Sequence, residues 1–364
     1  MKRYNMTLTI LSPVHIGSGQ DIDPLEYVVK DGVFYRLNLP KFLSQMDGAL
    51  RAEFNRKVSD PNPIVLRDFI HRHADPNQHT YFTADAGAFE SVYQRNLKNP
   101  NIKLEITLMP RSVGNWQAYI PGSSVKGAIR TAVISELTKQ KGLRNPNPKF
   151  FEKDVLGYND AKQDPFRCIR ISDAPLPEAA TFIDKTEILK RYKGPGPDPS
   201  GIQMFYEQCF SMLDGETIAA VGTLDVDDQL PQKKVFDRRQ NSEIAAVSMA
   251  MDALQILKSC RAFYLPKMQD EHDKFYKARP DSVKHNQELE DYSQQLLAVQ
   301  YADNEFPIRL GRFSHVECTT VDDYRQPITR KTRDGKNLPW GTTRTLSGGK
   351  MPMGWVKVRL DPIR

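Results

Sequence analysis

Two serines and two cations stand close together in the stretch PGSSVKGAIRTAVISEL. Its apolar spacing predicts a helix, and Ser123 or Ser124 is expected to cap it, because a hydroxyl there accepts a bond from an orphan backbone N–H. Lys126 and Arg130 are four residues apart, so they share one face of the helix. A helix N-terminus also offers unpaired N–H groups and a positive dipole end. The stretch predicts a phosphate-binding site, and an ordinary capped helix with solvated cations is the alternative.

A second candidate is the histidine of the loop SPVHIGSG. His15 could act as a general acid or base, because the pKa of histidine lies near neutrality. The alternative is a histidine that only hydrogen-bonds or stacks. Gly17 and Gly19 let the backbone approach a ligand closely. This loop is not the GxGxxG of a dinucleotide site, and Gly122 and Gly127 are followed by Ala128-Ile129 and not by the Lys-Ser/Thr of a P-loop, so no nucleotide cofactor is expected.

The third candidate is the basic segment near the C-terminus. Between Tyr324 and Lys350 there are seven Lys or Arg and one acid, Asp334. The glycines, tryptophans and hydroxyls of WGTTRTLSGGKMPMGW are typical of a mobile loop that follows a phosphate backbone and stacks on bases. A solvated basic loop is the alternative. Together with the preceding RLGRF, the candidate backbone-binding residues are Arg309, Arg312, Arg325, Thr342, Thr343, Arg344, Gly348, Gly349 and Lys350.

Composition narrows the classes of function. The chain has 51 basic and 45 acidic residues, a mild excess that suggests an anionic partner only where it is clustered. Four cysteines far apart predict reduced core thiols in a cytoplasmic protein. His71, His73 and His79 lack the further ligands that a metal site needs, so no metal is expected. The N-terminal MKRYNMTLTIL predicts a strand and not a signal peptide, and no run is apolar enough for a membrane helix.

The elements that must position these residues follow from periodicity. Up to residue 175 the pattern predicts a strand at 4–11, a hairpin around Asp31-Gly32, helices at 40–58 and 63–73, a polar loop at 80–100, a strand at 102–109, the helix after Gly122 and a strand at 167–172. This order is the start of a ferredoxin-like βαββαβ unit, so residues 1–175 are predicted to form a first domain.

Beyond residue 175 the pattern changes. It predicts strands at 181–191, 203–210 and 217–226, helices at 241–263 and 282–302, and a closing strand at 355–360. We interpret residues 176–364 as a second sheet domain with a helical insertion at about 237–303. The predicted fold class is α+β.

These segments together resemble a known family. SPVHIGSG after the first strand, YIPGSSVKGAIRTAVI, IRISD, RLGRF and GTTRTLSGGKMPMGWVKV are similar to the repeat-associated mysterious proteins (RAMPs) of CRISPR–Cas systems. Among these, the segments resemble most the end subunit of the type III-A (Csm) interference complex. The matching blocks span both ends of the chain and occur in order, whereas residues 175–303 match only in general character.

The resemblance implies two ferredoxin-like (RRM-like) domains, a glycine-rich loop near the C-terminus and a non-catalytic role. In that role the chain caps the backbone filament and holds the 3′ region of the CRISPR RNA. RAMP backbone subunits are then expected partners, with small helical subunits and trans-acting trimming nucleases as further candidates, and target RNA is met only indirectly. The implied RNA-binding residues are His15, Gly17, Gly19, Ser123, Ser124, Lys126, Arg130 and the candidates near the C-terminus.

A metal-independent endoribonuclease of the same superfamily, with His15 as general acid or base, is the alternative. It requires a second proton-transfer group near His15, which the sequence does not place.

Overall fold

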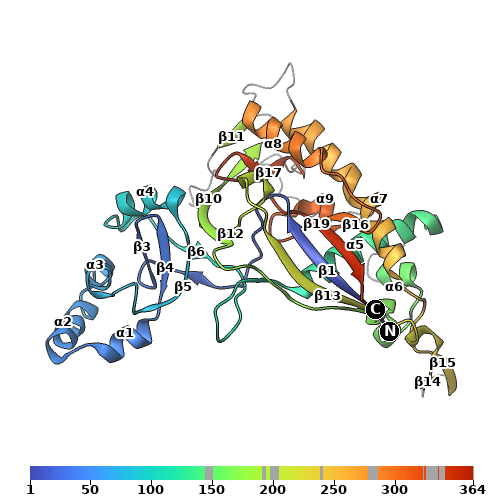
Figure 1. Cartoon of the computed structure of the whole chain (residues 1–364), viewed down its shortest axis with the longest axis horizontal. Helices are drawn as coiled ribbons and strands as arrows, with labels where there is room; N and C mark the ends of the chain where they lie inside the picture. The colour runs from blue at the N-terminus through green and yellow to red at the C-terminus, as the bar shows by residue number, and fades with distance from the viewer. Residues whose placement is uncertain are drawn as a thin grey trace.

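The structure, a computed structural model, describes residues 1–143, 151–190, 194–196, 205–237, 241–277, 286–322, 324, 335 and 341–363. An antiparallel five-stranded sheet lies at its centre (Figure 1), in the order β16-β19-β1-β13-β8. These strands are β1 (Lys2–Ile10), β8 (Ile169–Ile171), β13 (Ala219–Val226), β16 (Glu305–Arg309) and β19 (Trp355–Pro362).

Two helices, α5 (Gly122–Lys141) and α7 (Ala253–Glu271), cover one face of this sheet. Met6, Leu8 and Ile10 alternate with more exposed residues along β1, because successive side chains of a strand point to opposite faces. They share one core with the apolar stripes of both helices. The Tyr264 hydroxyl of α7 donates to the Ala128 carbonyl of α5 at 3.0 Å, which fixes one helix against the other.

In chain order, β1, α5, β8, β13, α7 and β19 have the βαββαβ connectivity of a ferredoxin-like unit. The unit is assembled from both ends of the chain, since three of its elements lie before residue 175 and three after it. The predicted boundary between residues 175 and 176 therefore does not separate two packing units.

A second sheet extends to the left of the central one in Figure 1, in the order β2-β6-β12-β10-β5-β4-β3, with β11 and β17 paired to β10 and β18 to β17. Its strands are β2 (Asp21–Ile22), β3 (Tyr27–Lys30), β4 (Val33–Leu37), β5 (Thr80–Asp85), β6 (Ile106–Thr107), β10 (Thr181–Lys190), β11 (Gly194–Gly196), β12 (Phe205–Cys209), β17 (Thr343–Ser347) and β18 (Met351–Pro352). The predicted hairpin at Asp31-Gly32 is confirmed.

Helices α1 (Leu39–Gln45), α2 (Gly48–Val58) and α3 (Pro63–His73) form the outer lobe of this half. The single predicted helix at 40–58 is two helices, because the backbone is extended at Met46, after α1, and Asp47 caps α2 by accepting a bond from the Leu50 N–H. The predicted polar loop at 80–100 is wrong: it contains β5 and α4 (Gly87–Asn96), whose Phe89 and Tyr93 are buried.

The insertion between β13 and β16 also differs from its prediction. Residues expected to start a helix at 241 form β15 (Ser242–Ala245), which pairs with β14 (Lys234–Asp237). Helix α7 begins only at Ala253, where Asp252 caps it by accepting from the Gln255 N–H at 2.7 Å. The remaining elements are β7 (Tyr119–Ile120), β9 (Ala174–Pro175), α6 (Phe151–Leu156), α8 (Gln287–Leu297) and α9 (His315–Thr319).

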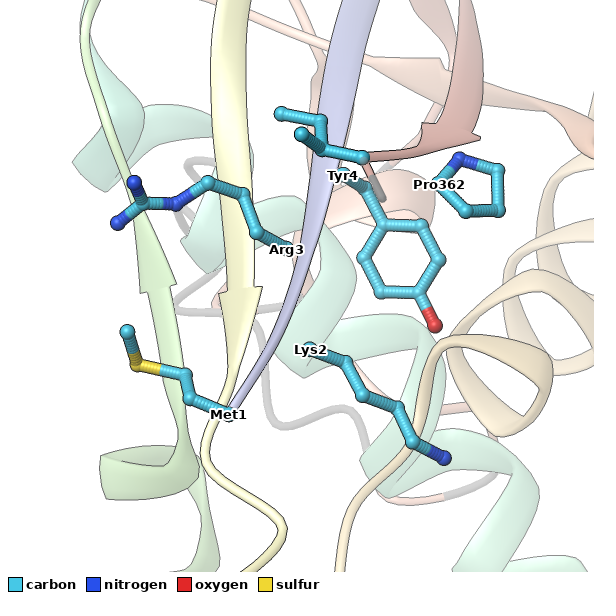
Figure 2. A pocket seen from close by; sticks show the side chains of 6 residues that line it. Met1, Lys2, Arg3, Tyr4 and Pro362 are labelled. Atoms are coloured by element: carbon cyan, nitrogen blue, oxygen red, sulfur yellow. The ribbon is translucent and has the colours of Figure 1, made fainter.

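An open hollow of about 610 Å³ lies where β1 begins and β19 ends. Figure 2 shows Arg3 and Tyr4 on opposite sides of the strand, and Arg3 is already paired with Asp225 at 2.8 Å. Because its lining brings no group of polar side chains together, we do not consider it a site. Among the residues that the structure describes, no helix is both long and apolar enough to cross a membrane.

Candidate nucleic-acid interface

The N-terminus of α5 is capped by a carboxylate and not by a serine. Pro121 is the N-cap residue, and neither Ser123 nor Ser124 caps the helix with its side chain. Instead Asp173, which follows β8, accepts a bond from the Gly122 N–H at 2.8 Å. The predicted serine cap is therefore corrected. Ser123 is exposed and Ser124 half-buried in the first turn.

The two cations of α5 bind groups of the same chain. Lys126 Nζ donates to the Ile169 carbonyl at 2.7 Å, and burial lowers the pKa of its ammonium. Arg130 pairs with Glu152 at 2.6 Å and with Asp164 at 2.9 Å. Burial alone would lower the pKa of Arg130, but its bonds to these carboxylates raise it. The alternative of two solvated cations on a helix face is therefore wrong for this structure, and phosphate binding by Lys126 and Arg130 stays a prediction.

Three segments that are distant in the sequence meet at one end of the central sheet: residues 12–19, 310–313 and 353–354. We call this the loop junction. The Arg312 N–H donates to the His15 carbonyl at 3.0 Å, and the Gly354 N–H donates to the Pro13 carbonyl at 2.8 Å. At Gly311, whose φ is +87°, a Cβ atom would come within 2.1 Å of the His15 carbonyl oxygen, so only glycine allows this close approach.

Three predicted residues of the junction face solvent. Gly17 and Gly19 are exposed, and Gly19 has open space around it. Arg312 is exposed as well, and its guanidinium lies 5.9 Å from the centre of the Tyr206 ring. The junction therefore offers accessible backbone next to one cation.

His15 is buried at the base of the junction, with 1% of its surface exposed. Its Nδ1 bonds to the Glu207 carbonyl at 2.7 Å, and its ring packs on Tyr206 and Phe313 at centroid distances of 4.7 and 6.1 Å. Burial lowers the pKa of the imidazole to about 4. A neutral ring with so little accessible surface supports the loop, and it is poorly placed to exchange protons with a bound RNA.

The glycine-rich stretch near the C-terminus forms an ordered hairpin. Gly348 and Gly349 turn between β17 and β18 with φ of +56° and +78°. A Cβ atom at Gly348 would lie 2.9 Å from Asp184 Oδ2, and one at Gly349 would lie 2.6 Å from Glu187 Oε2. Lys350 pairs with Glu288 at 3.1 Å. The expected mobile loop is thus replaced, within the described residues, by a turn that rests on carboxylates.

Two arginines expected to contact RNA are buried around one carboxylate, which we call the Glu271 cluster. Arg309 Nη1 lies 2.7 Å and Arg344 Nε 2.5 Å from Glu271 Oε1, and the Trp355 indole donates to Oε2 at 3.1 Å. Burial alone would raise the pKa of Glu271, but the two arginine charges lower it to about 2. Arg309 and Arg344 therefore link β16 and β17 to the end of α7, and their charges are engaged within the fold.

Thr343 is exposed and Thr342 half-buried at the start of β17, while Arg325 lies outside the described residues. Sequence reasoning missed Asp173, which caps α5. It also missed the acids that pair with the predicted arginines, namely Glu152, Asp164 and Glu271. One signal was available: a polar residue directly after a short strand, as in IRISD, often meets a helix N-terminus.

The fold is that of an α+β protein built on a ferredoxin-like sheet whose loops gather glycines at one end. The chain belongs to the RAMP superfamily, whose family model matches residues 7–208. It is similar to the CRISPR system Cms protein Csm5 of Streptococcus thermophilus, with 25% identity over 185 residues, which are 48% of this chain and 52% of that protein. The Csm5 of Methanocaldococcus jannaschii is 28% identical over 45% of this chain and 41% of its own length. The chain thus spans about half the length of these curated relatives.

Two solved structures share the fold. A chain of a Csm–crRNA–target RNA ternary complex of a type III-A CRISPR–Cas system matches 98% of this chain and 100% of its own length, with a TM-score of 0.68 and 17% identity. The crystal structure of T. onnurineus Csm5 matches 96% of this chain and 99% of its own, with a TM-score of 0.61 and 17% identity.

Proposed function

We propose that this chain is a non-catalytic, CRISPR RNA-binding subunit of a type III-A Csm complex, which caps the backbone filament and holds the 3′ region of the CRISPR RNA. The coarse assignment to a Csm complex rests on the RAMP superfamily match and on the similarity to Csm5 proteins. The whole-chain similarity to a subunit of an RNA-containing complex supports the same assignment. In this role the expected partners are CRISPR RNA and RAMP backbone subunits.

The loop junction is the observation that carries the RNA-binding part. It combines exposed backbone at Gly17 and Gly19 with Arg312, and backbone N–H groups and arginines are the usual contacts to phosphates. The outward face of the sheet is a weaker candidate, because its β1 positions are Arg3, Asn5, Thr7 and Thr9, and RRM sheets hold RNA by stacking aromatic side chains. Ser123 and Thr343 remain proposed as additional phosphate contacts.

The endoribonuclease alternative is less well supported. It needs His15 to exchange a proton with RNA, yet the ring is buried and neutral. Its hydrogen-bond partner is the main-chain carbonyl of Glu207, and the carboxylate of that residue is paired with Arg111.

The experiment compares Arg312→Ala with Lys258→Ala, an exposed cation on α7, in binding a labelled 3′ fragment of CRISPR RNA. Loss of one phosphate contact should reduce the slope of log K against log salt by about 0.7. We expect this reduction in Arg312→Ala only. Equal slopes in the folded variants would remove the loop junction from the RNA-binding surface.

A further inference from the structure

A cleft of about 400 Å³ lies between β5, the loop 111–118 and residues 177–181. We call it the Trp116 cleft. One wall is aromatic: the ring centroids of Trp116 lie 4.4 Å from Tyr81 and 6.1 Å from Phe82. Trp116 and Tyr81 are half-buried, so part of each ring surface stays open to a ligand.

The backbone that shapes this cleft is in an uncommon conformation. Trp116 and Ala179, which both line it, have φ values of +56° and +55°. Residues with side chains rarely adopt this region, and such residues gather at binding sites when the surroundings hold them there. Here Arg111 ties the two walls together, donating to the Trp116 carbonyl at 2.6 Å and to the Thr181 hydroxyl at 3.1 Å. The cleft is therefore formed in advance.

The electrostatics of the cleft favour a cation. The charge of Arg111 is neutralised by the buried Glu207, whereas Glu178 at the rim is exposed and has no partner among the described residues. The other polar residues of the lining, Thr83, Asn115 and Gln117, are neutral. A phosphate would meet an unpaired carboxylate and no available cation. One guanidinium already lies on this aromatic wall, with Arg111 Cζ 3.5 Å from the centre of the Phe82 ring.

We propose that the Trp116 cleft binds an arginine or lysine side chain of a neighbouring protein subunit. The cation stacks on Trp116 and Tyr81 and pairs with Glu178 at the rim. The identity of the neighbour as another subunit of the Csm complex rests on the proposed function. The preference of the cleft for a cation rests only on its own residues.

The first experiment uses the isolated chain and the small probe N-acetyl-arginine amide. The chain has three tryptophans, so the indole N–H resonance of Trp116 can be assigned with Trp116→Phe. We expect a saturable shift of that resonance, lost in Glu178→Gln and retained in Glu216→Gln, which removes an exposed acid elsewhere. A shift caused by adenosine or uridine but not by the probe would overturn the proposal in favour of a base pocket. No shift with any probe would also overturn it.

The second experiment uses the complex co-expressed with CRISPR RNA. Removing a cation–π contact should weaken subunit association roughly 3- to 30-fold, so Trp116→Ala and Glu178→Lys should release a protein neighbour while the chain keeps its RNA affinity. Trp116→Phe, which keeps an aromatic face, should restore association. Full association of the Glu178→Lys variant would contradict the proposed contact. If the wild-type chain did not assemble into a complex, the proposed function would fail. The experiment with N-acetyl-arginine amide would still show whether the Trp116 cleft binds a cation.

Discussion

Replacing Glu271 by glutamine should destabilise the whole chain, because this carboxylate is the only described counter-charge of Arg309. The side chain of Arg309 is 2% exposed and that of Arg344 is 5% exposed. In the variant, Arg309 keeps only its bond to the Met353 carbonyl at 3.1 Å, while Arg344 keeps Glu317 at 3.1 Å. Glutamine has nearly the same shape, so the change removes charge and little volume.

Removing one partner of a buried ion pair costs about 3–5 kcal/mol, since the remaining charge has neither water nor a counter-ion. The free energy of unfolding should therefore fall by about that amount in Glu271→Gln. The matched control is Glu288→Gln, which breaks the more exposed pair with Lys350 and should cost less than about 1 kcal/mol.

The assay is urea unfolding followed by circular dichroism, with the slope against urea checked for a two-state transition. A triple replacement of Glu271, Arg309 and Arg344 by Met should recover much of the loss, because the three buried charges are then removed together. If Glu271→Gln cost no more than Glu288→Gln, the assignment of these arginines to a structural cluster would be refuted, and both would again be candidates for RNA contacts.

Three further outcomes are expected. The pKa of His15 is about 4 in the folded chain and about 6.5 in the unfolded chain, so the unfolded state binds more protons as pH falls. The free energy of unfolding of the wild type should therefore fall by about 2 kcal/mol between pH 7 and pH 5 relative to His15→Gln. Parallel pH profiles of the two proteins would contradict the burial of the ring. Gly122→Ala should lower the free energy of unfolding by about 1–3 kcal/mol, because its Cβ would lie 2.3 Å from the Ile171 carbonyl oxygen. Gly127→Ala, which has open space around it, should instead stabilise the helix by up to about 1 kcal/mol, and equal effects in urea unfolding would rule out this packing. Gly349→Ala should lower the melting temperature more than Gly17→Ala, since only the former combines a positive φ with a contact to Glu187, and the reverse order would argue for a mobile turn.

Local signals in the sequence predicted many of the elements. Helix α3 was expected at 63–73 and is found at Pro63–His73, because Asn62 and Pro63 give an unambiguous start. The α5 stripe of Val125, Ile129 and Val133 was likewise predictable from its spacing. Helix α4 was missed because its buried Phe89 and Tyr93 stand among polar and small residues that weaken the periodic signal.

The arrangement of the site could not be predicted in the same way. The pairing of β1 with both β13 and β19 joins residues more than 200 positions apart, and local periodicity carries no information on such contacts. Arg309 and Arg344 are buried because both pair with Glu271. Glu271 is a single acid in a long helix that was interpreted as part of an insertion. A cluster of cations in a sequence indicates RNA contacts only when no acid of the folded chain neutralises those cations, and the sequence does not show which acids lie beside them.

The most direct test of the central claim is the RNA that accompanies the chain. A tagged copy is purified from cells that express a complete type III-A CRISPR locus, and the length distribution of the bound RNA is compared with that of complexes lacking the chain. We expect RAMP backbone subunits and CRISPR RNA to co-purify, and the RNA of complexes without the chain to have shortened or heterogeneous 3′ ends. Recovery of the chain without CRISPR RNA, or identical 3′ ends in its absence, would contradict the proposed capping function.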